Sequence, residues 1–131
     1  MMKYKGRRRK VDAFMQHLEK QFFSILGLAM RAGQIISGEE HVIKAVRGGQ
    51  AKLVVMAADA SENTTKKVTD KCHTYKVGLI QYGTREQLGE SIGKEFRVTV
   101  ALANNGFAKK LATLATQFGN EMELFGGEDF E

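Results

Sequence analysis

Hydrophobic residues recur at helical and then at strand spacings, in alternation, along this chain. Phe14, Leu18 and Phe22 open a series with steps of three and four residues that runs to Gly33, and this spacing predicts a helix. From Leu53 to Ala58 the chain is continuously apolar, which indicates a central strand covered on both faces. The whole pattern predicts helices over residues 11–33, 37–47, 59 or 61 to 75, 84–88, and 104 or 105 to 118. The first of these is either one helix or two that meet near residue 20. Strands are predicted over residues 34–36, 52–58, 77–82 and 97–103.

The alternation of helices and strands around a buried strand predicts an α/β layered sandwich with a small, mostly buried sheet. The 131 residues, of which 43% are hydrophobic, suit one globular core, and no internal repeat or linker divides them. Residues 1–10 have no apolar periodicity, so we expect a mobile arm there. From residue 119 the chain is rich in glycine and acidic residues, and we expect a frayed tail.

Residues 33–52 predict a short strand, a glycine turn, an amphipathic helix and a glycine stop. Ser37 and Glu40 have the spacing of a capping box, as do Thr84 and Gln87 further along the chain. The apolar positions 42, 45 and 46 share the core face of the helix. The opposite side, together with the turn before it, forms what we call the 38–47 surface: Gly38, Glu40, His41, Lys44 and Arg47.

Charge is spread unevenly along the sequence. The net charge is +5, but residues 1–31 carry +6, residues 32–116 carry +4 and residues 117–131 carry −5. A basic arm on a modestly basic domain favours a polyanionic partner, since neutralising phosphates releases counterions. The alternative is that the arm serves solubility or is an expression remnant.

Several classes of protein are excluded by what the sequence lacks. It has no apolar run of the roughly 18 residues that span a bilayer and no signal peptide, so we expect a cytoplasmic protein without a membrane partner. Cysteine and histidine do not recur at metal-ligand spacing, and no phosphate loop, dinucleotide fingerprint or hydrolase elbow is present. Cys72 and His73 point about 100° apart on a helix, and we expect Cys72 to lie on a buried stripe with Val68 and Tyr75. We therefore expect no enzyme activity, metal or cofactor.

The 38–47 surface carries groups that suit nucleic acid. Lys44 can donate to guanine O6 and N7, Glu40 can accept from exocyclic amines, and His41 can do either. Backbone N–H groups around Gly38 can bind a phosphate. The alternatives are an ordinary ion pair between Glu40 and Lys44, worth about 0.2–0.5 kcal/mol, and a capping role for Glu40.

A second candidate surface is the 92–97 loop, in which a glycine turn precedes a strand. Ile92 would be an exposed apolar side chain that packs on a splayed base, and Gly93 would form the turn. Lys94 and Arg97 would bind the flanking phosphates. The alternative is that Ile92 and Phe96 seal the end of the core.

An ordered set of segments resembles a known family. These segments are Ile25–Gly33, Gly38 with Lys44, Ala45–Val55, Ala57–Ser61, Asn63–Lys67, Cys72 and Leu88–Lys94. Together they resemble the bacterial YlxQ-type branch of the kink-turn-binding ribosomal protein family (large-subunit proteins L-seven-Ae and L-thirty-e). The resemblance covers about residues 22–117, which leaves residues 1–21 as a basic arm and helical extension and residues 118–131 as an acidic flexible tail.

The resemblance implies a three-layer α-β-α sandwich with a mixed sheet that binds kink-turn RNA without catalysis. In this family, a turn and helix that match residues 38–44 enter the opened major groove and contact guanines of sheared G·A pairs. By position, Lys44 matches the guanine-contacting lysine and Gly38 the glycine of closest approach, while the loop around Ile92–Arg97 matches the one that packs on a flipped-out nucleotide. Archaeal and eukaryotic members have Asn then Glu where this chain has Glu40 then His41, so its hydrogen-bond pattern differs.

These observations lead to one expected function and its rivals. We expect a monomeric RNA-binding protein whose partner is kink-turn or ribosomal RNA, with the ribosome as a further partner. A ribosome- or translation-factor-associated interaction module on the same fold, without kink-turn specificity, is the first alternative. A small-molecule enzyme on this scaffold is the second, and a deep pocket lined by His41 or Cys72 would support it.

Overall fold

The computed structural model describes residues 2–118 and 123–125, with side chains from residue 13 to residue 118. Helices and strands alternate over most of this part of the chain, as predicted. The helices are α1 (Met2–Arg31), α2 (Glu39–Gly48), α3 (Glu62–Tyr75), α4 (Arg85–Ser91) and α5 (Asn105–Phe118), and the strands are β1 (Ile35–Ser37), β2 (Leu53–Met56), β3 (Gly78–Gln81), β4 (Thr99–Leu102) and β5 (Glu123–Phe125).

The strands form one mixed sheet in the order β1-β4-β2-β3-β5. The central pair is antiparallel, with Val54 of β2 opposite Ala101 of β4, while β2 and β3 run parallel with Val55 opposite Ile80. The outer strands β1 and β5 are both antiparallel to their neighbours. Every residue of β2 and β4 is buried, as the continuous apolar run predicts for a covered strand.

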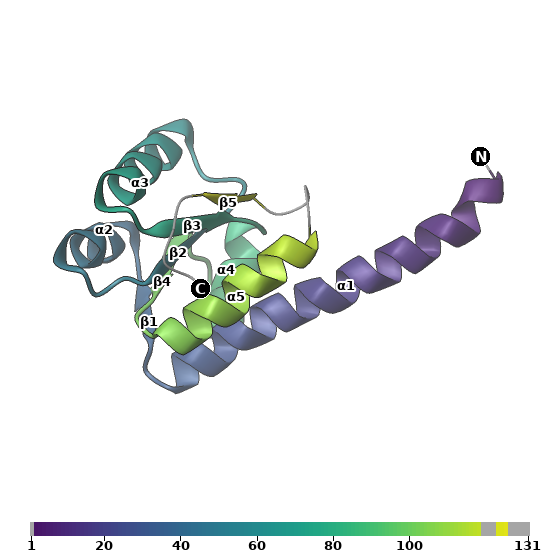
Figure 1. The fold of residues 1–131 in the computed structure, drawn as a ribbon, viewed down its shortest axis with the longest axis horizontal. Coiled ribbons are helices and arrows are strands. Elements are labelled where there is room, and N and C mark those ends of the chain that lie inside the picture. Colours follow the sequence, from purple (N-terminus) through teal and green to yellow (C-terminus); the bar gives the residue numbers. More distant parts are fainter. Residues whose placement is uncertain (1, 119–122, 126–131) are drawn as a thin grey trace.

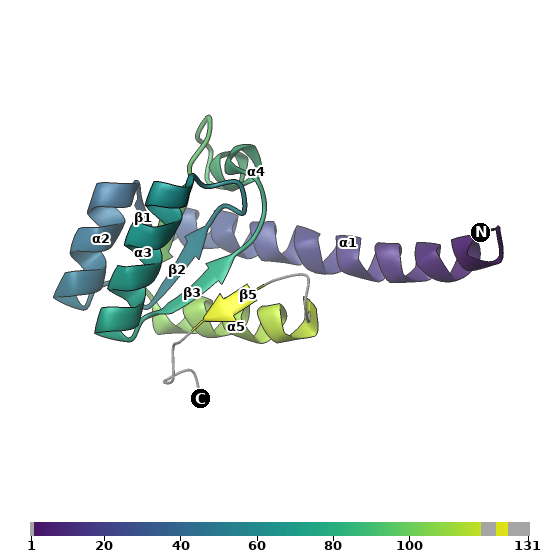
Figure 2. The same cartoon turned by 90° about the horizontal axis from the view of Figure 1, so that it is seen from above.

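Helices cover both faces of the sheet (Figures 1 and 2). Because side chains alternate along a strand, Leu53 and Val55 of β2 face α1, α4 and α5, while Val54 and Met56 face α2 and α3. Two hydrophobic clusters result, one on each side of the sheet. The α/β class and the three-layer α-β-α sandwich are therefore confirmed.

Helix α1 is a single helix, without a break near residue 20. Leu18, Phe22, Leu26 and Ala29 recur at steps of three and four residues and are buried against the sheet, while the N-terminal half projects beyond the domain (Figure 1). The structure extends the helix to Met2, where we expected a mobile arm over residues 1–10. Residues 2–10 contain no proline or β-branched residue, and they continue a helix whose costly nucleus is already formed. No helix in the part of the chain that the structure describes has the length and apolar content needed to cross a bilayer.

Strand β5 corrects the expectation of a frayed tail from residue 119. Residues 123–125 pair with β3, so that Leu124 lies opposite Ile80. The outer edge of β3 would otherwise present unpaired backbone groups, and these are what β5 satisfies. The other tail residues, 119–122 and 126–131, lie outside the described residues.

Three helices begin at residues where we predicted them to start, each with a side-chain cap. At the start of α5, Asn104 Oδ1 accepts from the Phe107 N–H at 3.1 Å. The Ser61 hydroxyl accepts from the Thr64 N–H at the start of α3, and Thr84 and Gln87 form a complete capping box on α4. Helix α4 extends to Ser91, three residues further than predicted. The prediction that Tyr75 is buried is wrong, because the apolar stripe of α3 ends with Cys72 and Tyr75, the last residue of the helix, is 44% exposed.

Candidate functional site

The predicted glycine turn lies between β1 and α2. Gly38 has φ 100° and ψ 142°, a conformation that residues with a Cβ rarely adopt. Its N–H donates to the Thr99 carbonyl at 3.0 Å, which ties the turn to β4. A Cβ at this position would come no closer than 3.8 Å to His41 Nδ1, so the backbone angle and not the space requires glycine.

The capping box predicted for Ser37 and Glu40 is wrong. Ser37 is the last residue of β1, and Gly38 is the N-cap of α2, which has no side-chain cap. The Ser37 hydroxyl instead accepts from Arg97 Nε at 2.7 Å. The N–H groups of the first turn of α2 are therefore not capped by a side chain, which is the condition under which a helix start binds an anion.

The polar side of α2 is exposed, as predicted. Glu40, His41, Lys44 and Arg47 all face solvent, and the buried positions 42, 43, 45 and 46 pack inward. His41 Nδ1 lies 3.2 Å from the Ser37 carbonyl oxygen. Within the described side chains, residues 13–118, Glu40 and Lys44 form no ion pair with each other. The predicted alternative in which they are simply partners is therefore wrong.

Glu39 turns away from this surface toward α3. Its carboxylate accepts from Thr64 Oγ1 at 2.9 Å and from Lys67 Nζ at 3.0 Å. The hydrogen bond from Lys67, followed by the one from Thr64, lowers the pKa of Glu39 below its ordinary value. Of the two adjacent carboxylates, only Glu40 is directed to solvent beside Lys44.

The Glu39–Lys67 pair gives a small, pH-dependent contribution to stability. Because folding lowers the pKa of Glu39, the pair stabilises the protein fully at pH values above the ordinary pKa of 4.5. This stabilisation is lost as the pH falls through the lower pKa of the folded state. We expect Lys67→Met to reduce the free energy of unfolding at pH 7 by at most about 1 kcal/mol, because the lysine is largely exposed. Urea titrations at pH 7 and in acid would measure this, with Lys66→Met as the control. Equal stability losses in the two variants would contradict the assignment.

The 92–97 loop differs from the prediction at its apolar residue. Ile92 is 4% exposed and packs in the cluster on the α1 side of the sheet, because it lies four residues after the buried Leu88 and continues the inner face of α4. Phe96 is 52% exposed. Gly93 has φ 77° and Lys94 is exposed, so the predicted glycine turn and its cation are present. The exposed apolar side chain of this loop is thus Phe96 and not Ile92. Of the alternative in which both residues seal the end of the core, only the part that concerns Ile92 is confirmed.

One side chain joins the loop to the start of α2. Arg97 Nε donates to Ser37 Oγ, and Arg97 Nη1 donates to the Phe96 carbonyl at 2.8 Å. The Arg97 N–H donates to the Arg85 carbonyl at 3.0 Å, which attaches the same residue to α4. The structure therefore brings the 92–97 loop beside Gly38 and His41. Arg47 lies nine residues after Gly38, about 13 Å further along the axis of α2. Of the predicted residues on α2, it is therefore the most distant from the 92–97 loop.

Cys72 is a buried core residue. Its side chain is 3% exposed, and desolvation raises the pKa of the thiol from 9.0 to about 12. The thiol is therefore protonated at neutral pH and is a poor nucleophile. Among the residues that the structure describes, no three His, Cys, Asp or Glu side chains gather as a metal-binding group.

We expect Cys72 to be protected from alkylation in the folded protein. Iodoacetamide at pH 8 should modify native protein at least about tenfold more slowly than protein unfolded in urea, because the thiolate is both rare and covered. Mass spectrometry over time would measure the two rates. Equal rates would show that the site opens readily or that the thiol is accessible.

Comparison with known proteins adds independent information. A family model described as "Ribosomal protein L7Ae/L30e/S12e/Gadd45 family" matches residues 20–112. RNA-binding protein YlxQ of Bacillus subtilis (strain 168) is 54% identical over 94 residues, which cover 72% of this chain and 94% of that protein. Large ribosomal subunit protein eL30 of Spodoptera frugiperda is 32% identical over 93 residues, which cover 70% of this chain and 82% of that protein.

A solved structure agrees with these matches. A protein of unknown function from Bacillus halodurans C superposes with a TM-score of 0.70 at 46% identity, covering 71% of this chain and 94% of that chain. The family model covers most of the chain, and the sequence relatives and the fold point the same way. The chain therefore belongs to the ribosomal protein L7Ae/L30e/S12e/Gadd45 family, as a member of its YlxQ-type branch.

Proposed function

We propose that this protein binds structured RNA of the kink-turn type and stabilises its kinked form without catalysing a reaction. The observation that carries the proposal is the hydrogen bond from Arg97 to Ser37, which holds the 92–97 loop against the start of α2. An exposed aromatic ring, several cations and an uncapped helix start are thereby adjacent. Membership of a family with relatives named as RNA-binding and ribosomal proteins supports the same proposal.

The chemistry of the two surfaces suits a kinked RNA better than a regular duplex. An A-form major groove is too narrow for side chains to enter, whereas a kink opens the groove and releases a base. Lys44 would donate to guanine, Glu40 would accept from an exocyclic amine, and His41 would contact a base or a phosphate. Phe96, in place of Ile92, would stack on the released base, with Lys94 and Arg97 near its phosphates.

The arrangement also reduces an electrostatic conflict. Two adjacent carboxylates at the start of α2 would repel a phosphate, but the charge of Glu39 is offset by Lys67. Gly38 allows the backbone to approach closely, and the N–H groups behind it can face an anion. Because the protein gains these contacts only when the RNA is bent, binding shifts the RNA toward its kinked state.

A titration with fluorescent RNA would test the proposal. We expect tight binding to a kink-turn and much weaker binding to a control in which Watson–Crick pairs replace the G·A pairs. Equal and strongly salt-dependent binding to both RNAs would show contact without selectivity. Binding to neither would overturn the proposal and favour the ribosome- or translation-factor-associated interaction module, for which the adjacent carboxylates Glu39 and Glu40 are the supporting feature.

Lys44→Ala should weaken binding to the kink-turn by about 1–3 kcal/mol if the lysine contacts a guanine. Lys109→Ala, an exposed lysine on α5, removes the same charge far from the 38–47 surface and is the control. Affinity would be measured for both variants at one salt concentration. Unchanged affinity in Lys44→Ala would refute the assigned role.

A further inference from the structure

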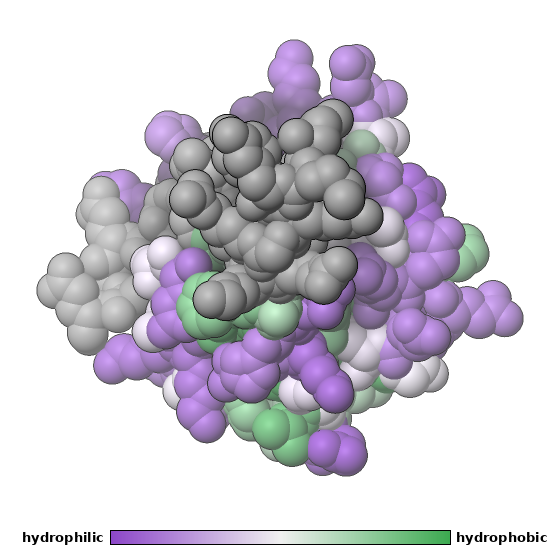
Figure 3. All heavy atoms as spheres, turned by 90° about the vertical axis from the view of Figure 1, so that its right-hand side faces the viewer, coloured by the Kyte–Doolittle hydropathy of each residue, from purple (hydrophilic) through white to green (hydrophobic). Residues whose placement is uncertain are grey.

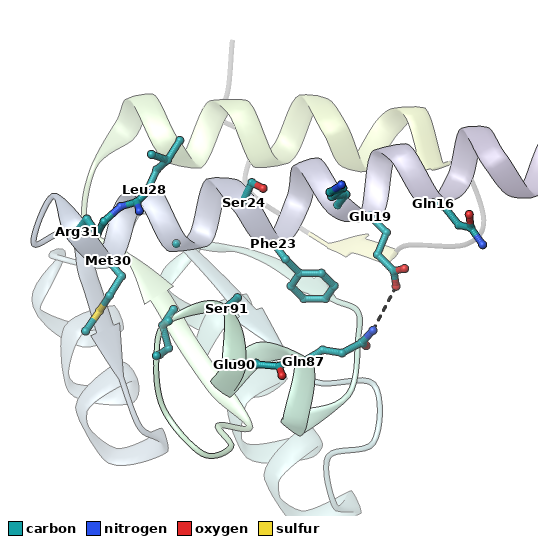
Figure 4. A pocket seen from close by; sticks show the side chains of 14 residues that line it. Gln16, Glu19, Phe23, Ser24, Leu28, Met30, Arg31, Gln87, Glu90 and Ser91 are labelled. Atoms are coloured by element: carbon teal, nitrogen blue, oxygen red, sulfur yellow. Dashed lines mark hydrogen bonds between the residues drawn. The ribbon is translucent and has the colours of Figure 1, made fainter.

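Helix α4 carries the 92–97 loop, but a groove separates part of this helix from α1. The groove has a volume of about 840 Å³ and is lined by residues of α1, of α4 and of the start of the loop (Figure 4). Two cations and two carboxylates balance each other in its lining: Lys20, Arg31, Glu19 and Glu90. The described surface seen from the projecting end of α1 is mainly hydrophilic, with scattered apolar side chains (Figure 3). These features favour neither a polyanion nor an apolar partner in the groove, and they leave α4 incompletely packed against α1.

Polar contacts hold this short helix from two sides. On the side of α1, Glu19 accepts from Gln87 Nε2 at 3.4 Å, which is the dashed line in Figure 4. At the start of α4, the Arg85 N–H donates to Asp59 Oδ1 at 3.1 Å. Asp59 lies in the turn between β2 and α3. Of the two residues predicted to begin α3, Ser61 caps that helix, whereas Asp59 binds the first N–H of α4.

Asp59 and Arg85 contact each other through both backbone and side chain. Besides the bond to Asp59 Oδ1, Arg85 Nη2 donates to the Asp59 carbonyl at 2.6 Å, and Arg85 Nε lies 3.5 Å from Asp59 Oδ2. The two residues are 26 positions apart. The Ala58 N–H also donates to the Gly83 carbonyl at 2.7 Å, which joins the same two turns at a second point. The start of α4 is therefore fixed to the turn after β2.

One peptide group connects Asp59 and Arg85 to the candidate RNA-binding site. The Arg85 carbonyl accepts from the Arg97 N–H at 3.0 Å, and Arg97 Nε donates to Ser37 Oγ at 2.7 Å. Asp59 therefore acts on the 92–97 loop through Arg85. Helix α2 is bound in turn to α3, which follows the Asp59 turn, by the hydrogen bonds of the Glu39 carboxylate. These contacts form a closed ring through α2, α3, α4 and the loop.

The exposure and the charge of the pair separate a positioning role from a purely structural one. The side chains of Arg85 and Asp59 are 37% and 44% exposed, and ion pairs this exposed add little to the stability of a fold. A carboxylate also repels RNA, so removal of its charge alone would strengthen binding. Loss of a positioning contact would weaken binding instead. The two effects have opposite signs.

We propose that Asp59 is a positioning residue for RNA binding. Through Arg85 it holds the 92–97 loop beside the start of α2, so that Phe96 meets the released base while the 38–47 surface contacts the G·A pairs. This inference rests on the proposed function and deepens it, because recognition of the released base then depends on a residue that acts through another. A small displacement of a positioned group is enough to weaken its contact strongly.

The test compares three variants of the full-length chain with the wild type. Asp59→Ala removes the contacts of the carboxylate, whereas Asp59→Asn keeps an oxygen that can accept from the Arg85 N–H. Asp70→Ala removes the same charge from an exposed position on α3 and is the control. Affinities would be measured for a kink-turn RNA with its released base and for the same RNA with an abasic site there. Urea unfolding would report stability, and amide hydrogen exchange would report protection of the Arg97 N–H in the free protein.

We expect the wild type, Asp59→Asn and Asp70→Ala to lose about tenfold in affinity when the base is removed, because the loop stays in place. Asp59→Ala should bind the complete RNA about tenfold more weakly than the wild type, and removal of the base should then have little further effect. Its midpoint of urea unfolding should hardly change. Its Arg97 N–H should exchange at least about threefold faster than in the wild type.

Two results would overturn the inference. Unchanged or stronger binding by Asp59→Ala would show that only its charge matters. Equal weakening of binding to both RNAs, together with a loss of stability, would show a structural role alone. The proposed function fails separately, if the wild type binds the kink-turn and a straight duplex alike. In that case, faster exchange of the Arg97 N–H in Asp59→Ala alone would still support the hold of Asp59 on the loop.

Discussion

Phe22→Ala should lower the free energy of unfolding by about 3–5 kcal/mol, the largest single-residue effect that we expect in this chain. The Phe22 side chain is completely buried. Its ring lies edge-on to Phe23 at 5.2 Å and to Tyr82 at 5.5 Å, measured between centroids. Removal of the ring would leave a cavity between α1 and the sheet and would separate two aromatic neighbours from their partner.

Urea unfolding followed by circular dichroism would measure the loss. Phe14→Ala is a matched control on the same helix, because Phe14 is 53% exposed and its removal should change stability by less than about 0.5 kcal/mol. If the two variants lost similar stability, α1 would not be anchored as the structure shows.

The fold was predictable because it depends on patterns that extend over many residues. The continuous apolar run at 53–58 indicated a covered central strand, and all of β2 is buried. The spacing of Val42, Ala45 and Val46 placed the inner face of α2 correctly, and with it the exposed side of that helix. Such signals survive small errors in element boundaries, because a shift of one residue leaves most of the pattern intact.

Details of the candidate site depend on single positions, and these were less predictable. The capping-box spacing of Ser37 and Glu40 failed because β1 extends one residue further, so that Gly38 and not Ser37 begins the helix. Ile92 is buried, and Phe96 is the exposed apolar residue of the loop, because α4 continues past Leu88 and carries Ile92 inward. In each case a shift of one to three residues in an element boundary decides the outcome, and a local pattern does not fix boundaries that closely.

The bond between Arg97 and Ser37 is a long-range contact, which the sequence does not record locally. The two residues are 60 positions apart, and no spacing rule connects them. It nevertheless decides how the 92–97 loop and the start of α2 lie relative to each other. The packing beneath the loop should therefore matter as much for RNA binding as the exposed residues do.

Gly89→Ala tests this point, and we expect it to reduce both stability and RNA affinity. Gly89 lies in α4 beneath the loop, where a Cβ would overlap Phe96 Cα and would lie 2.7 Å from Phe96 N and 2.8 Å from the carbonyl carbon of Glu95. All three atoms belong to the backbone, so no side-chain rotation can relieve the overlap. Alanine favours a helix over glycine by up to about 1 kcal/mol, but overpacking typically costs about 1–3 kcal/mol and can cost more.

The loop can accommodate the added methyl group only by moving away from α4, and Phe96 and Arg97 must move with it. We therefore expect a net loss of about 2 kcal/mol in the free energy of unfolding and at least about tenfold weaker binding to a kink-turn RNA. Gly48→Ala is the matched control, since a Cβ there meets only the flexible side chain of Gln50 and should cost little. Urea unfolding and the fluorescent titration would be run on both variants. If Gly89→Ala were as stable as the wild type and bound RNA as tightly, the position of the loop would not be what organises the site.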